Sequence, residues 1–317
     1  MDDRYQEDDE LMTETPTVAF LGLGRMGLPM AANVADAGFP VVVYNRTRSV
    51  AEEFAQRDGV TASVADSPRA AAEAADVVVT MLADEPALRA VYEGDNGLIA
   101  GWSDGKIALD MGTTGPAGTA WLADVIGRAG GDVVDAPVSG STNAAQTRTL
   151  TLMAGGSDQA LKTVRPVLEA MGSNIYHLGA TGTGSAMKLA VNNVIYALGQ
   201  AVSESLILAE RAGIERELAY DVFCNSAIAA PMVKYRQRNY VEPDDSPVTF
   251  ALRLAAKDLR LITGLAAEVG APMPQAALNL QETDEAIAAG FGEEDMAAVA
   301  VYLRNAAAAN GQQEARA

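Results

Sequence analysis

The motif Gly22-Leu23-Gly24-Arg25-Met26-Gly27 follows directly on an apolar run, Thr17 to Leu21, and precedes a segment with helical spacing. A strand, a G-x-G-x-x-G turn and a helix in this order are the fingerprint of a dinucleotide-binding βαβ unit. Gly22 permits the tight turn, Gly24 lets a pyrophosphate approach the backbone, and Gly27 lets helix and strand pack closely. The start of the helix offers free N–H groups and a dipole that favour anions, so we predict that this motif contacts the cofactor. A glycine-rich turn without a ligand is the weaker alternative.

The first half of the chain alternates short apolar runs with alanine-rich segments of helical spacing. This alternation is typical of βαβ units around a parallel sheet, so we predict an α/β Rossmann domain. The expected strands are Thr17 to Leu21, Pro40 to Tyr44, Asp76 to Leu82, Lys106 to Asp110, Asp132 to Ala136, Thr149 to Ala154 and Ile175 to Leu178. Helices are clearest at Met26 to Ala37 and Val50 to Arg57.

The pattern changes after the glycine cluster at residues 179–184, where a long helical run without proline begins. We predict helices at Ser185 to Ala212, Glu215 to Ser226, Phe250 to Val269, Pro274 to Ala289 and Asp295 to Asn305. The chain is therefore expected to join a Rossmann domain (17–182) to an all-α domain (183–305) through a long helix. Residues 1–16 are interpreted as an acidic tail, and 306–317 as a tail that frays.

The net charge of −19 narrows the choice of partners. Nucleic acid and anionic membrane both require a basic surface, and no run of 18 or more apolar residues predicts a membrane span. One cysteine, Cys224, cannot form an internal disulfide, and with one histidine, His177, it is too little for a zinc site. The acidic N-terminus does not resemble a secretory signal, so we expect a cytoplasmic protein. Strong acidity with scarce lysine favours a salt-rich cytoplasm over an ordinary acidic protein.

The end of the second expected strand distinguishes two forms of the dinucleotide. An acidic residue here would bind the ribose 2′-hydroxyl of NAD, but the sequence is Tyr44-Asn45-Arg46-Thr47-Arg48. Two guanidinium groups, a hydroxyl and an amide suit a 2′-phosphate, because arginine makes charge-assisted bidentate contacts with phosphate. The arginines could instead be solvated surface charges. We predict NADP as the cofactor, with NAD possible.

A second cluster, Asp135-Ala136-Pro137-Val138-Ser139-Gly140-Ser141, follows another expected strand. Successive backbone N–H groups form an anion nest, so Ser139 and the amides around Gly140 could bind a carboxylate. Taken alone, such a segment is more often a plain turn.

A third cluster opens the long helix and contains Lys188 and Asn192, which are four residues apart and therefore share one helix face. Lysine is scarce in this chain, and Lys188 is surrounded by alanine, leucine and valine. Partial burial would lower its pKa toward the range useful for proton transfer. On general base rates a helical lysine is usually a solvated surface group.

The fourth cluster runs from Phe250 to Lys257-Asp258-Leu259. Phe250 and Lys257 are seven residues apart, which predicts that they lie on one face of a helix. A routine charged pair on an amphipathic helix is the alternative.

Together, in this order and spacing, the four clusters resemble the β-hydroxyacid dehydrogenase family, over about residues 17 to 305. The family includes 3-hydroxyisobutyrate dehydrogenase, tartronate semialdehyde reductase and glyoxylate/succinic semialdehyde reductase. The resemblance implies an enzyme that transfers hydride between a nicotinamide cofactor and a small hydroxy or aldehyde acid. It also implies an all-α domain that helps to form dimers or tetramers.

The resemblance also implies roles for individual residues. Lys188 corresponds to the catalytic lysine that exchanges a proton with the substrate oxygen. The residues implied in substrate binding are Ser139, Gly140, Asn192 and Asp258. Those implied in cofactor contact, besides the glycine motif and Asn45 to Arg48, are Leu82, Thr113, Phe250 and Lys257.

Two departures from the family pattern bear on the substrate. Gly112 stands where relatives often carry serine, and Ser141 stands where the hydroxyisobutyrate enzymes usually carry glycine. The second favours the glyoxylate and semialdehyde reductases. An NAD-linked 3-hydroxyisobutyrate dehydrogenase and a non-catalytic dinucleotide-binding module are the alternatives. Glyoxylate, hydroxyisobutyrate and the succinic, tartronate and methylmalonate semialdehydes all remain open as substrates.

Overall fold

The computed structural model describes residues 15–314, and the chain divides into two compact units, Met1–Lys188 and Leu189–Ala317. The acidic tail expected at 1–16 lies outside the described residues except for its last two positions. The final three residues of the tail expected at 306–317 also lie outside the described residues. Each unit has its own apolar core, so each is described by itself.

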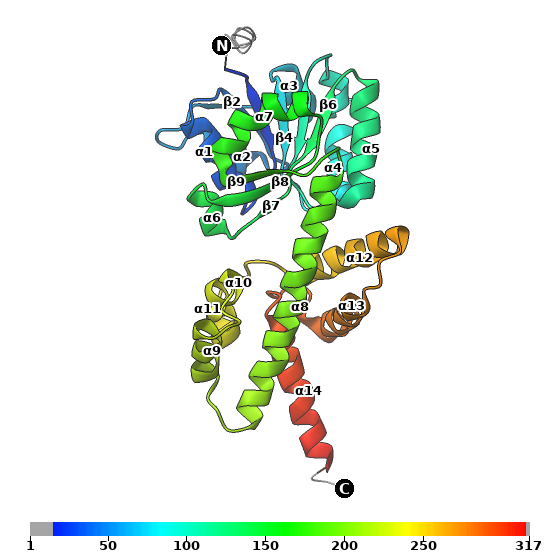
Figure 1. The fold of residues 1–317 in the computed structure, drawn as a ribbon. Helices are drawn as coiled ribbons and strands as arrows, with labels where there is room; N and C mark the ends of the chain where they lie inside the picture. The colour runs from blue at the N-terminus through cyan, green and yellow to red at the C-terminus, as the bar shows by residue number, and fades with distance from the viewer. Residues whose placement is uncertain (1–14, 315–317) are drawn as a thin grey trace, which may run out of the picture. The chain divides into compact units, whose positions relative to one another are not determined.

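Unit 1 is built on a six-stranded parallel sheet with the order β3-β2-β1-β4-β5-β6 (Figure 1). Its strands are β1 (Val18–Leu21), β2 (Val41–Tyr44), β3 (Ala62–Val64), β4 (Val77–Thr80), β5 (Ile107–Asp110) and β6 (Asp132–Asp135). This order reverses direction at β1 and β4, and it is the arrangement of a doubly wound dinucleotide-binding fold. The predicted Rossmann architecture is confirmed.

Apolar side chains cover both faces of this sheet, because a parallel sheet is buried between two layers of helices. Successive residues of a strand point to opposite faces, so Val18 and Phe20 join one core while Ala19 and Leu21 join the other. The first core is completed by helices α1 (Gly27–Asp36), α2 (Arg48–Ala55) and α7 (Asp158–Met171). The second is completed by α3 (Pro68–Glu73), α4 (Glu85–Tyr92), the 3-10 helix η1 (Leu98–Gly101) and α5 (Gly115–Arg128).

Unit 1 also contains a small three-stranded sheet, in the order β7-β8-β9. Its elements are β7 (Val138–Ser139), β8 (Leu150–Ala154) and β9 (Gly172–His177), with the short helix α6 (Thr142–Gln146) between the first two strands. Strands β3 and β7 were not predicted from the sequence. β3 is a three-residue edge strand of half-buried and exposed residues, and β7 has only two residues, so neither carries a readable apolar run.

Unit 2 is helical, as predicted. The long helix α8 (Thr183–Arg211) crosses the division between the units. It is followed by α9 (Arg216–Asn225), α10 (Pro231–Tyr235), α11 (Gln237–Val241), the 3-10 helix η2 (Pro243–Asp245), α12 (Leu252–Val269), α13 (Pro274–Ala286), the π-helical η3 (Ile287–Phe291) and α14 (Ala298–Glu314). Helix α14 extends nine residues beyond the expected end at Asn305, because the intervening residues include four consecutive alanines, the strongest helix formers.

The start of α12 differs from the prediction. The helix begins at Leu252, so Phe250 precedes it and does not share a helix face with Lys257. The segment before it pairs with residues 294–296 instead: the Phe250 carbonyl accepts the Met296 N–H at 2.9 Å, and the buried Asp295 carboxylate accepts the N–H groups of Thr249 and Phe250, at 2.8 and 3.1 Å. Asp295 also forms an ion pair with Arg236 at 2.7 Å. The Phe250 carbonyl, which an earlier helical turn would use as an acceptor, is thus bonded outside the helix.

No helix within residues 15–314 is long and apolar enough to cross a membrane. The same residues contain no cluster of His, Cys, Asp or Glu side chains that could hold a metal ion.

Candidate active site

The glycine motif forms the turn between β1 and α1 in unit 1. Gly22 has φ of +99°, and a Cβ there would stand 2.4 Å from the Met81 carbonyl oxygen, so only glycine fits without strain. A Cβ on Gly27 would stand 1.9 Å from the carbonyl oxygen of Gly22. Two of the three glycines are therefore required by the backbone packing itself.

Gly24 is different, since a Cβ added to it would meet nothing within 4 Å. Its lack of a side chain leaves open space beside the start of α1. Neither a side-chain cap nor an acidic residue occupies the first turn of that helix. Free N–H groups next to an open glycine are what a pyrophosphate needs, so these residues fit a dinucleotide.

Asn45 couples the glycine turn to the end of β2. Its Oδ1 accepts the Leu23 N–H at 3.1 Å, and its Nδ2 donates to the Thr47 carbonyl at 3.0 Å. A cavity of about 100 Å³ opens beside it, lined by Tyr44, Asn45, Arg46, Arg48, Ala51, Val64, Ala65 and Asp66. The amide, predicted to contact the cofactor, thus also fixes the turn and borders the cavity.

Arg46 and Arg48, which follow β2, differ in their contacts. Arg48 forms ion pairs with Glu52 and Asp66, both at 2.7 Å, and its side chain is about half exposed. Arg46 is exposed and forms no ion pair with any residue in the described part of the chain. Arg46 is therefore the guanidinium that is more readily available to an anion. Asp66 is a neighbouring acid that the strand-end motif did not reveal.

Asp110 organises the loop that carries Thr113. The buried carboxylate accepts the Thr80 hydroxyl at 2.9 Å, the Thr114 hydroxyl at 3.1 Å and the Gly112 N–H at 3.3 Å. A Cβ on Gly112 would stand 2.8 Å from the carbonyl oxygen of Leu82, so a serine here would require the backbone to shift. Leu82 in turn lies against Gly22, since its Cδ2 would be 3.0 Å from a Cβ built there. Leu82 and the loop after β5 therefore border the glycine turn.

The carboxylate-binding candidates lie at the end of β7. Ser139 is half-buried, and Gly140, with φ of +145°, leaves room that a Cβ would take from Leu150 and Ala144. Ser141 accepts the Ala144 N–H at 3.3 Å and so caps α6. Because this cap is a structural reason for a serine at position 141, the residue is weaker evidence for the class of substrate.

Helix α8 carries Lys188 and Asn192 one turn apart, as the spacing predicted. Lys188 is half-buried and Asn192 is buried. In unit 2 the Asn192 Nδ2 donates to Oδ2 of Asp258 at 2.8 Å. The hydroxyl of Tyr196, one further turn along α8, donates to the same oxygen at 2.5 Å. Lys257 lies 2.9 Å from the other oxygen of Asp258.

This cluster fixes the orientation of the Asn192 amide. Asp258 is 2 % exposed and receives Lys257, Asn192 and Tyr196 on its two oxygens. Burial, together with the neighbouring carboxylate, raises the pKa of Tyr196 well above its usual value, so its hydroxyl remains a hydrogen-bond donor. Sequence spacing could have identified Tyr196, because residues 188, 192 and 196 continue one helical face.

Replacing Tyr196 with phenylalanine should lower the free energy of unfolding by about 2 kcal/mol, because a buried carboxylate loses a charge-assisted hydrogen bond. Urea unfolding would measure the change. Tyr176→Phe is the matched control, since that ring is 56 % exposed. Equal effects of the two substitutions would show that the buried hydrogen bond adds nothing.

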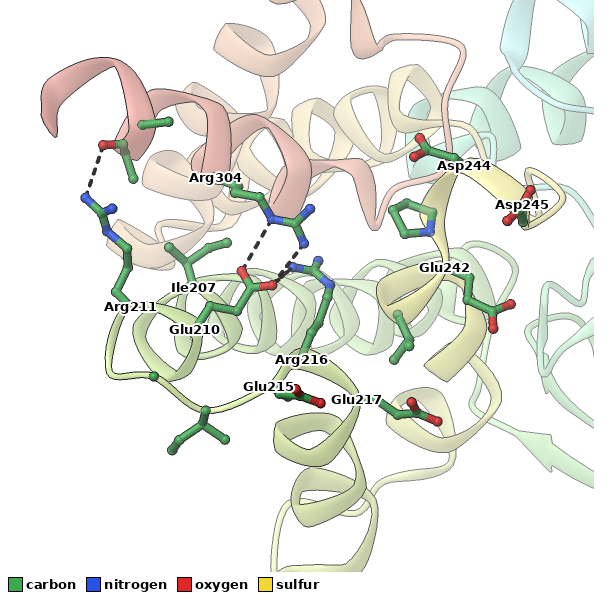
Figure 2. Close-up of a pocket in the computed structure, with 16 residues that line it drawn as sticks. Ile207, Glu210, Arg211, Glu215, Arg216, Glu217, Glu242, Asp244, Asp245 and Arg304 are labelled. Carbon is green, nitrogen blue, oxygen red and sulfur yellow. Dashed lines mark hydrogen bonds and ion pairs between the residues drawn. The ribbon is translucent and has the colours of Figure 1, made fainter. Parts of the chain in front are cut away.

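A separate open groove of about 1000 Å³ lies in unit 2 between the end of α8, the start of α9, the end of α11 and α14 (Figure 2). Glu210 at its wall accepts both Arg216 and Arg304, at 2.7 and 3.0 Å. Most of its other charged residues are acidic, and none of the residues predicted from the sequence motifs lines it. The groove is therefore distinct from the candidate site.

Two family models together match nearly the whole described chain. Residues 17–179 match the model described as the NAD binding domain of 6-phosphogluconate dehydrogenase, and residues 182–303 match the model described as NAD-binding of NADP-dependent 3-hydroxyisobutyrate dehydrogenase. Neither model is confined to the glycine motif, so the likeness extends over both units.

Named relatives agree with these models. The chain is 32 % identical over 290 residues to 2-(hydroxymethyl)glutarate dehydrogenase of Eubacterium barkeri, covering 91 % of this chain and 95 % of the relative. It is 33 % identical over 292 residues to glyoxylate/succinic semialdehyde reductase 2 of Arabidopsis thaliana, covering 92 % and 80 %. The crystal structure of a 3-hydroxyisobutyrate dehydrogenase from Salmonella typhimurium superposes with a TM-score of 0.83 at 28 % identity, covering 90 % and 99 %. The chain belongs to the β-hydroxyacid dehydrogenase family of NAD(P)-dependent oxidoreductases.

Proposed function

We propose that this protein uses NADPH to reduce a small aldehyde acid, or oxidises the corresponding hydroxy acid, with Lys188 as the proton-transfer residue. The observation that carries the proposal is the pair on α8, in which a half-buried lysine stands one turn before an asparagine whose amide is fixed by Asp258. The named relatives reduce glyoxylate or semialdehydes, or oxidise hydroxy acids. In this proposal residues 17–182 bind the cofactor, while 183–305 contribute to substrate binding and subunit association.

The side chains then have distinct tasks. The glycine motif and Asn45 hold the cofactor, with Leu82, Thr113, Phe250 and Lys257 as further contacts. When bound, the nicotinamide supplies or accepts the hydride. Ser139 and the backbone at Gly140 hold the substrate carboxylate, and Asn192, oriented by Asp258, aligns the carbonyl.

Lys188 completes the reaction by moving one proton. In the reducing direction its ammonium group donates a proton to the carbonyl oxygen as negative charge develops there, and the amine is left neutral. In the oxidising direction the neutral amine accepts the hydroxyl proton. A substrate carboxylate held at a fixed point would keep that oxygen within reach of the amine.

A substrate panel tests the proposal directly. Glyoxylate, the three semialdehydes and hydroxyisobutyrate would each be assayed with both cofactors. We expect turnover of at least one aldehyde acid with NADPH. Binding of NADPH without turnover of any panel member would favour the non-catalytic module instead, and a preference for NADH would favour the NAD-linked dehydrogenase.

The cofactor preference should depend on Arg46. Arg46→Ala is expected to lower kcat/KM for NADPH about 10- to 100-fold, the value of one or two charge-assisted contacts to phosphate. The value for NADH should change little, because NADH has no 2′-phosphate. Arg57→Ala is the control, since that exposed arginine lies just beyond α2. Equal losses with both cofactors would refute the assignment of Arg46.

The proposal extends to the setting of the enzyme. The charge of −19 with five lysines favours a cytoplasm rich in salt, and the family resemblance favours a homodimer or homotetramer. Light scattering at low and high salt would give the subunit number. A monomer at both concentrations would contradict the oligomer.

A further inference from the structure

Asp135, at the end of β6, is a buried carboxylate to which the proposed reaction gives no task. It is 1 % exposed. Its Oδ1 accepts the Gly182 N–H at 2.7 Å, and its Oδ2 accepts the Ser185 N–H at 2.6 Å. Both donors belong to the start of α8, 47 and 50 residues away in the sequence. One side chain of the sheet therefore satisfies two N–H groups at the helix start.

The first turn of α8 has no comparable cap of its own. The Thr183 hydroxyl donates to the Ala180 carbonyl at 2.8 Å and is thereby engaged elsewhere. A carboxylate at the N-terminus of a 29-residue helix also interacts favourably with the helix dipole. Asp135, at the end of β6, thus caps the N-terminus of α8. In most helices a Ser, Thr or Asp within the helix's own first residues does this.

The backbone around this carboxylate is closely packed at Gly155 and Gly184. A Cβ on Gly184 would stand 2.1 Å from the Met153 carbonyl oxygen and 3.0 Å from Oδ2 of Asp135. A Cβ on Gly155 would stand 2.7 Å from Oδ1. Asp135 and Gly155 also exchange backbone hydrogen bonds, at 3.0 and 2.8 Å. Glycines therefore let the helix start approach the strand end closely.

Burial disfavours the ionised form of Asp135 relative to its neutral form. Burial raises the pKa of Asp135 to about 6, and the charge of Asp110 adds to the increase, against the lowering effect of the N–H donors. Titratable groups on the adjoining elements include Lys188 and Tyr196 on α8, and Tyr176 and His177 on β9. The His177 ring lies 3.5 Å from Asp158. A carboxylate retained despite such a cost is typical of a functional site.

We propose that Asp135 is a positioning residue whose buried carboxylate fixes the first turn of α8, and with it Lys188, to the end of β6. Ser185 is held directly, and Lys188 follows it by three residues, within one turn of helix. The inference rests on the proposed role of Lys188. A small displacement of a proton-transfer group is sufficient to slow a reaction greatly.

The test compares Asp135→Asn with Asp132→Asn, since Asp132 is an exposed residue at the other end of the same strand. A carboxamide in place of the Asp135 carboxylate cannot accept two N–H groups with both of its terminal atoms. We expect kcat at pH 7.5 to fall at least tenfold in Asp135→Asn, while the Kd for NADPH stays within twofold and the melting temperature is not lowered. Asp132→Asn should match the wild type. Unchanged kcat, or equal losses of kcat and cofactor affinity, would overturn the proposal.

Hydrogen exchange in the wild-type protein provides a measurement independent of activity and of the variant's folding. We expect the amides of Gly182 and Ser185 to exchange at least about 100-fold more slowly than unprotected amides. Their protection should fall as the pH rises from about 4 to about 6 and then level off, because over that range the carboxyl ionises when an opening solvates it but stays protonated while buried. Unprotected amides would refute the anchor. If Lys188→Ala were fully active but these amides were protected, the proposed function would fail and the anchor would stand.

Discussion

Replacing Lys188 with alanine is expected to lower kcat by about 10³-fold, in the range contributed by a well-placed general acid or base. The Kd for NADPH should be nearly unchanged, because the glycine turn and Asn45 that we assign to the cofactor are untouched. Lys188→Arg should be almost as inactive as the alanine variant, since a guanidinium keeps the charge but does not release a proton at neutral pH. Steady-state kinetics and a fluorescence titration with NADPH would measure both quantities.

Lys162→Ala is the control for that experiment. Lys162 is an exposed lysine on α7, so its loss removes the same charge from the same unit without touching α8. Turnover by Lys188→Ala within tenfold of the wild-type rate would exclude Lys188 as the proton-transfer residue. Loss of cofactor binding together with turnover would mean that the substitution had damaged unit 1 more generally.

The second large effect concerns Gly27, where an alanine should be incompatible with the native turn. The added Cβ would lie 1.9 Å from the Gly22 carbonyl oxygen and 3.3 Å from the Phe20 ring, so α1 must move away from β1. Overpacking of this kind destabilises a protein by roughly 3 kcal/mol or more when the obstacle is backbone. Urea unfolding should show the loss, and NADPH binding should disappear with the displaced turn.

Gly24→Ala is expected to behave in the opposite way. Its Cβ meets nothing within 4 Å, and its φ is not positive, so stability should stay within about 1 kcal/mol of the wild type. Affinity for NADPH should nevertheless fall at least tenfold, because the methyl group enters the space that we assign to the pyrophosphate. If Gly24→Ala bound NADPH normally, the glycine turn would not be the phosphate site.

Much of the fold follows from local patterns. The apolar runs before Gly22, Asn45 and Met111 place β1, β2 and β5, since a parallel sheet is buried on both faces and its strands are continuously apolar. The same criterion fails for β3, which lies at the sheet edge and is not fully buried. Helical spacing likewise fails at Phe250, where the pattern continues but the Phe250 carbonyl is bonded to the distant Met296 N–H rather than within the helix.

Some residues of the candidate site could be predicted from the sequence, and others could not. Lys188 and Asn192 are found from a spacing of four residues, because helical geometry makes that spacing spatial. The residues that hydrogen-bond to these groups and orient them lie far away in the sequence, so sequence spacing does not predict them. Asp258 reaches Asn192 across 66 residues and Asp135 reaches Ser185 across 50, so only the folded chain reveals them. Ser141 is the opposite case. Its position in the sequence favoured one class of substrate, but in the structure its side chain caps α6.

The reach of Asp295 back to Thr249 and Phe250 has a consequence for biosynthesis. Translation delivers these two residues about 45 positions before the carboxylate that holds their N–H groups. The beginning of α12 therefore cannot take its final form on a nascent chain until the segment leading into α14 has left the ribosome. A transcript cut short before codon 295 would yield a polypeptide in which Arg236 is buried without its acidic partner, a marked liability toward proteases.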